Sequence, residues 1–199
     1  LGRPPVVTCR GTRPSQAAVR DTFARVDEIV RPETPLWATV GDEFQVVYAD
    51  TAASLHATTL VRTMLPDVDC RFGIGAGEVR DVERAASGHV IQDGSAWWHA
   101  RDAITRLHAM QERGHPALRT WFHGDDREQQ DLANAFLASR DHILSRMKVR
   151  ERRIAARYFS GIAQTEIARD EKISQPAVSQ TLARSGALDL GLALEALRG

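Results

Sequence analysis

Two adjacent carboxylates, in the run Gly41-Asp42-Glu43-Phe44, are the residues of this chain whose types and spacing best suit chemistry. They fall between two apolar runs, 36–40 (LWATV) and 44–49 (FQVVYA), a pattern that predicts a β-hairpin with both carboxylates at its turn. Carboxylate oxygens at a rigid turn can hold Mg²⁺ against the phosphates of a nucleotide. Asp42 and Glu43 are therefore candidate metal ligands. The alternative is a solvated turn, since Gly-Asp is common in hairpins.

A second acidic ligand would have to complete such a site, because two-metal phosphoryl transfer needs a further carboxylate on a neighbouring strand. Its expected place is the end of the apolar run 4–9 (PPVVTC), where the chain continues as Cys9-Arg10-Gly11. Arg10 cannot ligate a cation, but a guanidinium can bind a phosphate without any metal. This residue favours a domain that binds a nucleotide without turning it over.

An aromatic pair is the next candidate for nucleotide contact. Aromatic faces stack on nucleobases, so Trp97 and Trp98 could flank a base or ribose. Both lie in a stretch, 95–112, whose apolar residues recur at helical spacing, and we expect one of the two indoles to point into the core. The run 73–77 (GIGAG) lies within a predicted strand, so it is not a dinucleotide-binding fingerprint, which needs a strand-to-helix turn.

Three runs, TVGDEFQVVYAD, DCRFGIGAGEV and QDGSAWWHARDAI, occur in this order between residues 6 and 107, and together they resemble the SatD family of bacterial proteins. GDEF and RFGIGAGEV are also similar to the core of GGDEF diguanylate cyclases and class III nucleotidyl cyclases. That resemblance implies a ferredoxin-like palm, with Asp42 and Glu43 holding Mg²⁺ against a nucleotide and Gly75 on the strand that lines the floor of the site. It also implies an aspartate where this chain has Arg10.

The last quarter of the chain, residues 149–184, has the pattern of a helix-turn-helix. Residues 163–168 (AQTEIA) predict a short helix with Ile167 and Ala168 facing inward, and residues 171–173 (EKI) predict the turn. Ser174 stands where an N-cap belongs, and Pro176 is tolerated in a first helical turn. The apolar residues predicted to pack the second helix down are Ala177, Val178, Leu182 and Ala183.

The remaining residues of this second helix are polar and are predicted to form its outer face. A helix that binds in the major groove of DNA needs polar side chains on that face. The region also resembles the DNA-binding region shared by sigma factors and LuxR-type regulators. The resemblance implies two sets of DNA contacts, to which we add two polar residues of the first helix as candidates. The base or phosphate contacts are Ser174, Gln175, Ser179, Gln180 and Arg184; the backbone contacts are Arg150, Arg152 and Arg153; the added residues are Gln164 and Thr165. The alternative is a fold that serves protein contacts only.

Charge is distributed unevenly along the chain. The formal net charge is zero, so the total charge says nothing about nucleic acid. Between residues 140 and 157, however, seven Lys or Arg stand against Asp141 and Glu151, which predicts a basic surface beside the helix-turn-helix. The seven are Arg140, Arg146, Lys148, Arg150, Arg152, Arg153 and Arg157.

Cysteine usage and hydropathy point to the cytoplasm. Cys9 and Cys70 lie in apolar, strand-like runs without metal-ligand spacing, which favours buried thiols in a reducing compartment. No apolar run approaches the roughly twenty residues of a membrane span, and no signal peptide is visible. We expect a cytoplasmic protein with no membrane contact.

The predicted elements follow the order β-α-β-β-α-β-α up to residue 112, with 80–92 interpreted as a loop. This order predicts an α+β fold with a ferredoxin-like, nucleotidyl-cyclase-palm-like domain over residues 1–124. Residues 125–199 predict an all-α domain, which contains a long helix at 126–146 and the helix-turn-helix. A closing helix at 187–197 is expected to pack on the DNA-binding unit or on a partner chain.

These patterns together predict a DNA-binding transcription regulator. A homodimer on double-stranded DNA is expected, because a single helix-turn-helix rarely binds a specific site tightly. The degenerate cyclase-like domain would bind a nucleotide effector or mediate dimerisation. The alternative is an Mg²⁺-dependent nucleotidyl cyclase or nucleotidyltransferase that uses Asp42 and Glu43, with the helix-turn-helix as an accessory. Arg10 argues against catalysis, and the alternative stays open at this point.

Overall fold

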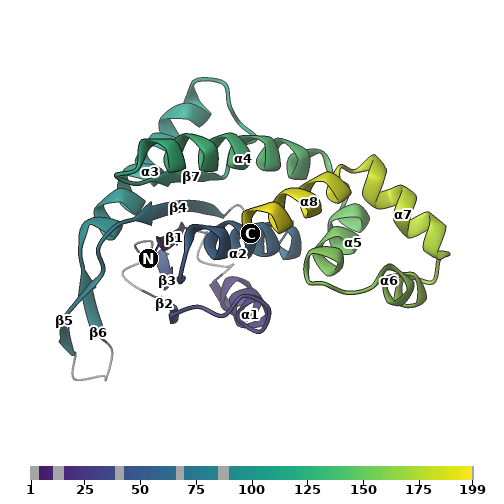
Figure 1. The fold of residues 1–199 in the computed structure, drawn as a ribbon, viewed down its shortest axis with the longest axis horizontal. Coiled ribbons are helices and arrows are strands. Elements are labelled where there is room, and N and C mark those ends of the chain that lie inside the picture. Colours follow the sequence, from purple (N-terminus) through teal and green to yellow (C-terminus); the bar gives the residue numbers. More distant parts are fainter. Residues whose placement is uncertain (1–4, 11–15, 39–42, 66–69, 85–89, 199) are drawn as a thin grey trace.

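A five-stranded mixed sheet forms the centre of the α+β part of the molecule (Figure 1). The computed structural model describes residues 5–10, 16–38, 43–65, 70–84 and 90–198. The strands, in their order across the sheet, are β2 (Thr34–Ala38), β3 (Glu43–Val47), β1 (Pro5–Arg10), β4 (Arg71–Ala76) and β7 (Thr120–His123). The pairs β2–β3, β3–β1 and β1–β4 are antiparallel, and β4–β7 is parallel. The antiparallel pairing of β2 with β3 confirms the predicted hairpin. Glu43, however, is the first residue of β3 and not a turn residue, and residues 39–42 lie outside the described part of the chain.

Helices cover both faces of the sheet. Successive residues of a strand point to opposite faces, and on β1 Val7 joins the core cluster formed with α1 (Gln16–Asp27) and α2 (Thr51–Met64). Its neighbour Val6 packs in a second cluster with Ala96 and Ala100 of α3 (Ser95–Glu112). The bounds of α3 are those that the apolar spacing predicts.

Glycines of β4 allow α3 to lie directly on the sheet. A Cβ atom added at Gly73 would stand 2.2 Å from the Ala100 carbonyl oxygen, and one at Gly75 would stand 2.1 Å from the Ala96 carbonyl oxygen. Real Cβ atoms do not approach a backbone oxygen so closely, so only glycine fits at either position. The glycine-rich run is therefore a contact surface between strand and helix.

α2 lies at the centre of the whole molecule, because α1, α4 (Arg127–Arg146), α5 (Val149–Phe159) and α8 (Ala187–Arg198) all pack against it. Residues 54–63 of α2 are all buried. Three of its threonines satisfy their hydroxyl groups by donating to backbone carbonyls one turn earlier, as Thr59 does to Leu55 at 2.7 Å. This bonding explains how a helix rich in threonine can be buried on all sides.

α4 is joined to the sheet and to α2 by a buried ion pair. Arg140 and Asp141 are both 0% exposed and lie 2.8 Å apart. Arg140 donates to the Thr58 hydroxyl of α2 at 2.9 Å, and Asp141 accepts the backbone N–H of Thr120 of β7 at 2.8 Å. The prediction that Arg140 belongs to a basic surface is therefore wrong, because the side chain is fully buried and all three guanidinium nitrogens donate hydrogen bonds inside the protein.

The four C-terminal helices follow the predicted order. α6 (Gln164–Glu171) and α7 (Gln175–Arg184) are separated by residues 172–174, and α8 follows α7 after a short turn. α8 packs on α2, α5 and α7. Of the two packings expected for the closing helix, the one against the DNA-binding unit is therefore present within the chain. One core cluster of buried side chains runs without interruption from the sheet, through α2, to α7 and α8.

One element contradicts the sequence-based expectation. Residues interpreted as a loop at 80–92 contain two strands, β5 (Arg80–Arg84) and β6 (Val90–Asp93), which pair antiparallel as a separate ribbon that extends from the body of the molecule (Figure 1). Hydrophobic periodicity finds strands that bury one face. The strands of this ribbon pair with each other through their backbones. Because their sequence is polar, it carries no hydrophobic periodicity from which the strands could be predicted.

Two smaller expectations concern compartment and membrane. Cys70 is a buried thiol, as predicted, while the side chain of Cys9 is outside the described part of the structure. Among the described residues, no helix combines the length and the apolar character needed to cross a membrane.

Candidate functional site

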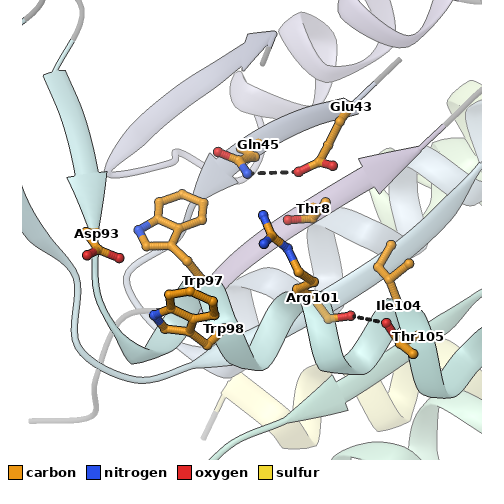
Figure 2. Close-up of a pocket in the computed structure, with 9 residues that line it drawn as sticks. All are labelled: Thr8, Glu43, Gln45, Asp93, Trp97, Trp98, Arg101, Ile104 and Thr105. Atoms are coloured by element: carbon orange, nitrogen blue, oxygen red, sulfur yellow. Dashed lines mark hydrogen bonds between the residues drawn. The ribbon is translucent and has the colours of Figure 1, made fainter. Parts of the chain in front are cut away.

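A pocket of about 230 Å³ opens between the sheet and α3 (Figure 2). It lies near the end of the β2–β3 hairpin, where the carboxylates were predicted. β1 and β3 supply the polar floor, and α3 supplies the aromatic and basic wall. The lining residues are Thr8, Glu43, Gln45, Asp93, Trp97, Trp98, Arg101, Ile104 and Thr105.

The two indoles of the predicted aromatic pair are held differently. Trp97 is half-buried and packs edge-on against Trp37 of β2, with ring centroids 5.6 Å apart. Its Nε1–H is buried and has no hydrogen-bond partner among the described residues. Trp98, the next residue along α3, is 61% exposed. The prediction that one of the pair is structural is consistent with this difference, and both rings still line the pocket.

Arg101 is the pocket residue that the sequence reasoning missed. It stands one helical turn after Trp97 on α3, and its guanidinium carbon lies 5.9 Å from the centroid of the Trp98 ring, within the range of a cation–π contact. Figure 2 shows the guanidinium pointing across the pocket toward Gln45 and Thr8. The sequence does hold a signal for it: Arg101 follows Trp97 by four residues and Trp98 by three. In a helix this spacing places all three side chains on one side.

Of the predicted nucleotide-binding residues, Glu43 and Trp97 line this pocket. The Glu43 carboxylate accepts a hydrogen bond from the Gln45 amide nitrogen at 3.0 Å. Arg10 is opposite Glu43 in the pairing of β1 with β3, but its side chain lies outside the described structure. Asp42 is also outside the described residues. Gly75 does not line the pocket, because it is covered by α3.

Of the two carboxylates in the Mg²⁺ site that the cyclase resemblance implies, Glu43 lines the pocket and Asp42 lies outside the described residues. Within the described part of the chain, no three His, Cys, Asp or Glu side chains lie close enough together to hold a metal ion. The pocket that contains Glu43 also contains the Arg101 guanidinium, whose positive charge opposes a second cation nearby.

α6 and α7 form the second candidate site. Ile167 and Ala168 of α6 and Val178 and Leu182 of α7 are buried, as predicted. Lys172 ends α6 in the left-handed conformation, with φ 54°, and so turns the chain sharply between the helices. The Ser174 hydroxyl then accepts the backbone N–H of Ala177 at 3.3 Å, which confirms the predicted N-cap of α7.

α7 and its N-cap carry five of the ten side chains predicted to contact DNA. Ser174, Gln175, Gln180 and Arg184 are exposed, and Ser179 is half-buried. Ala183 is also exposed, so the prediction that it packs inward is wrong; α7 buries a narrower stripe than its apolar residues suggest. On α6, Thr165 is exposed and Gln164 is half-buried. The Gln164 side chain accepts a hydrogen bond from the Gln175 amide at 2.9 Å, which ties the starts of the two helices together.

Three of the arginines predicted to contact DNA are engaged in ion pairs within the protein. Arg153 donates two hydrogen bonds of 2.7 Å to the Glu171 carboxylate at the end of α6. These hydrogen bonds lower the pKa of Glu171 from its ordinary value, and Arg150 lies 3.5 Å from the same carboxylate. Arg184 lies 3.5 Å from Glu151. These arginines therefore hold α5, α6 and α7 together, whatever else they contact.

The charge of this part of the chain is nevertheless positive. Residues 146–184 contain nine Lys or Arg and four Asp or Glu, so the rest of a chain with zero net charge is acidic. Arg146, Lys148 and Lys172 are exposed. They extend the positive charge beyond the arginines that are bound internally.

Comparison with known proteins assigns the chain to a family. A sequence model of the SatD family matches residues 13–192. The chain belongs to the SatD family. No curated protein and no solved structure matches it.

The extent of this match bears on both sites. The SatD family pattern covers α3, with the wall of the pocket, and continues through α5, α6 and α7. The motifs that suggested this family from the sequence end at residue 107, so the match reaches further than they do. The C-terminal helices are therefore part of the SatD family sequence and not an appendage to it.

Proposed function

We propose that this SatD family protein is a DNA-binding transcription regulator in which α7 reads DNA. The observation that carries the proposal is the pair of short helices α6 and α7, joined by a sharp turn, with α7 capped by Ser174. Val178 and Leu182 anchor α7, while Gln175, Gln180 and Arg184 face outward. Amide and guanidinium groups on such a face suit the hydrogen-bonding edges of base pairs in the major groove.

The α+β part supplies the input to this regulator in our proposal. The strand order β2-β3-β1-β4 with antiparallel neighbours is the order expected of a ferredoxin-like domain, and it supports the proposed likeness to nucleotidyl cyclases. We propose that the pocket between this sheet and α3 binds a nucleotide, because Trp97 and Trp98 offer aromatic surface beside polar groups. The other proposed role of this part is to form the dimer that a two-fold DNA site requires.

The experiment that tests the DNA-binding proposal is recovery of DNA fragments bound by the purified full-length chain from sheared genomic DNA, followed by sequencing. We expect one enriched sequence with two related half-sites about 34 Å apart, or a multiple of that spacing, because a dimer contacts one face of the duplex. Recovery of no fragment above the input at low salt would overturn the proposal. The same recovery with added nucleotides tests whether the pocket controls DNA binding.

A further inference from the structure

Among the described residues, Arg101 is the one positively charged side chain that lines the pocket between the sheet and α3. Arg101 forms no ion pair with any carboxylate in the described part of the chain, and its guanidinium lies over the face of Trp98. By contrast, most arginines of the C-terminal helices form ion pairs with Glu or Asp, as Arg153, Arg157 and Arg184 do. A guanidinium that lines a pocket without a carboxylate partner has its N–H donors available to an anion.

The surroundings of Arg101 indicate what kind of anion this is. The Trp98 ring beneath the guanidinium is exposed, and the Trp97 ring lies on the same wall, so a planar ring of the ligand can stack beside the bound anion. The buried Trp97 Nε1–H has no acceptor among the described residues, and the Thr8 hydroxyl belongs to the polar floor of the pocket. The pocket thus offers aromatic surface, one cation, hydrogen-bonding groups and the carboxylates of Glu43 and Asp93 in about 230 Å³.

We infer that Arg101 binds the phosphate of a nucleotide in this pocket and that the binding does not depend on a divalent metal ion. The inference rests on the nucleotide-binding role proposed above. A guanidinium presents N–H donors in a plane that matches two phosphate oxygens, and so takes the place that Mg²⁺ has in a cyclase. Glu43 is then a polar wall of the pocket, with its carboxylate oriented by Gln45.

The test is titration of the full-length chain, followed by tryptophan fluorescence, because Trp97 and Trp98 line the pocket. The probes are AMP and GMP, with adenosine and guanosine as the matching ligands that lack phosphate, each in EDTA and in excess Mg²⁺. We expect at least one nucleotide to bind in EDTA about tenfold or more tightly than its nucleoside, the effect of a charge-assisted hydrogen-bond pair. Mg²⁺ should not tighten it.

Two variants of α3 make the test specific. Arg101→Gln should bind the nucleotide no more tightly than the nucleoside, while Arg106→Gln, an exposed arginine of the same helix that does not line the pocket, should keep the preference. Circular dichroism checks that both variants fold. Nucleotide binding that requires Mg²⁺, or that survives Arg101→Gln unchanged, would overturn this inference alone. If no probe changes the fluorescence, the nucleotide-binding role proposed for the pocket is overturned with it.

Discussion

Asp141 is the carboxylate that neutralises two buried arginines, Arg140 and Arg62. It pairs with Arg140 at 2.8 Å and with Arg62 of α2 at 3.6 Å. It also accepts the backbone N–H groups of Arg119 and of Thr120, the first residue of β7. Burial lowers the pKa of Arg62 to about 10, because the low-dielectric interior disfavours its charge, and Asp141 opposes that shift. One carboxylate therefore balances two buried guanidinium groups from two helices.

Replacement of Asp141 by asparagine should be strongly destabilising. The side chain keeps its shape, but Arg140 and Arg62 lose their counter-charge in the interior, so we expect the free energy of unfolding to fall by about 3–5 kcal/mol. The measurement is urea denaturation followed by circular dichroism. Asp131→Asn, an exposed change on the same helix, is the control and should shift the value by less than about 0.5 kcal/mol. An Asp141→Asn variant as stable as this control would refute the account of the network.

His123 at the end of β7 should make stability depend on pH. Burial and the neighbouring His99, whose ring centroid is 4.6 Å away, lower the pKa of His123, while Asp102 and Asp125 oppose the shift and Arg106 adds to it. The folded state therefore prefers the neutral imidazole. Its stabilising contribution is present above the unfolded pKa of about 6.5 and is lost as the pH falls through the lower folded value.

We expect the urea concentration at the unfolding midpoint to decrease as the pH is lowered from about 8 to about 5. The decrease should be smaller in His123→Gln, because this variant has no imidazole at position 123 to protonate. Urea titrations of both proteins across this range are the measurement. An equal fall in the two proteins would show that other groups carry the pH dependence.

At the scale of elements, the contact of α3 with β4 decides where the pocket lies. The glycines of β4 let the backbone of α3 approach the sheet, so Trp97, Trp98 and Arg101 are held above Thr8 and Gln45. A side chain at the glycine positions would lift the helix and open the pocket. The glycines serve the site through this packing, without contact with a ligand.

The substitution Gly75→Ala tests how much the close packing of α3 on β4 contributes to stability. The added methyl group meets the Ala96 carbonyl oxygen and the backbone of Ala100, so we expect a loss of about 3 kcal/mol in the free energy of unfolding, the upper range for overpacking. Gly114→Ala is the comparison, since its φ of 99° strains an alanine but no atom lies within 4 Å of the added group; about 1–2 kcal/mol is expected. Equal losses in both variants would show that α3 does not rest on the glycines.

Elements with a strong apolar period could be predicted from the sequence, and those held by polar contacts could not. The bounds of α3 and the Ser174 cap of α7 follow from local pattern and cap chemistry. The β5–β6 ribbon has no such pattern. The burial of Arg140 depends on threonines 81 and 82 residues away in the chain, and such partners are invisible to local pattern. Arg101 was missed because a pocket needs two elements to be placed together.

At the scale of the whole molecule, the sheet and the C-terminal helices share one core. α2 is buried by helices from both parts, and His56 of α2 forms a 3.0 Å hydrogen bond with the Phe159 carbonyl at the end of α5. The predicted division at residue 124 therefore separates two proposed functions, while the core of buried side chains continues across it. α3 packs on one face of the sheet in a separate cluster, and the other face belongs to the core that anchors α7. A ligand in the pocket would therefore have to shift the sheet itself for the proposed input to reach the proposed output.

The most direct test of the central claim is the affinity of the full-length chain for a recovered DNA fragment, measured by fluorescence anisotropy at several salt concentrations. We expect the double variant Gln180→Ala, Arg184→Ala to bind that fragment at least about tenfold more weakly, since each base contact contributes about 1–3 kcal/mol. Gln129→Ala, an exposed glutamine on α4, should bind like the unchanged protein. Binding of the double variant as tight as that of the unchanged chain would contradict the reading of DNA by α7.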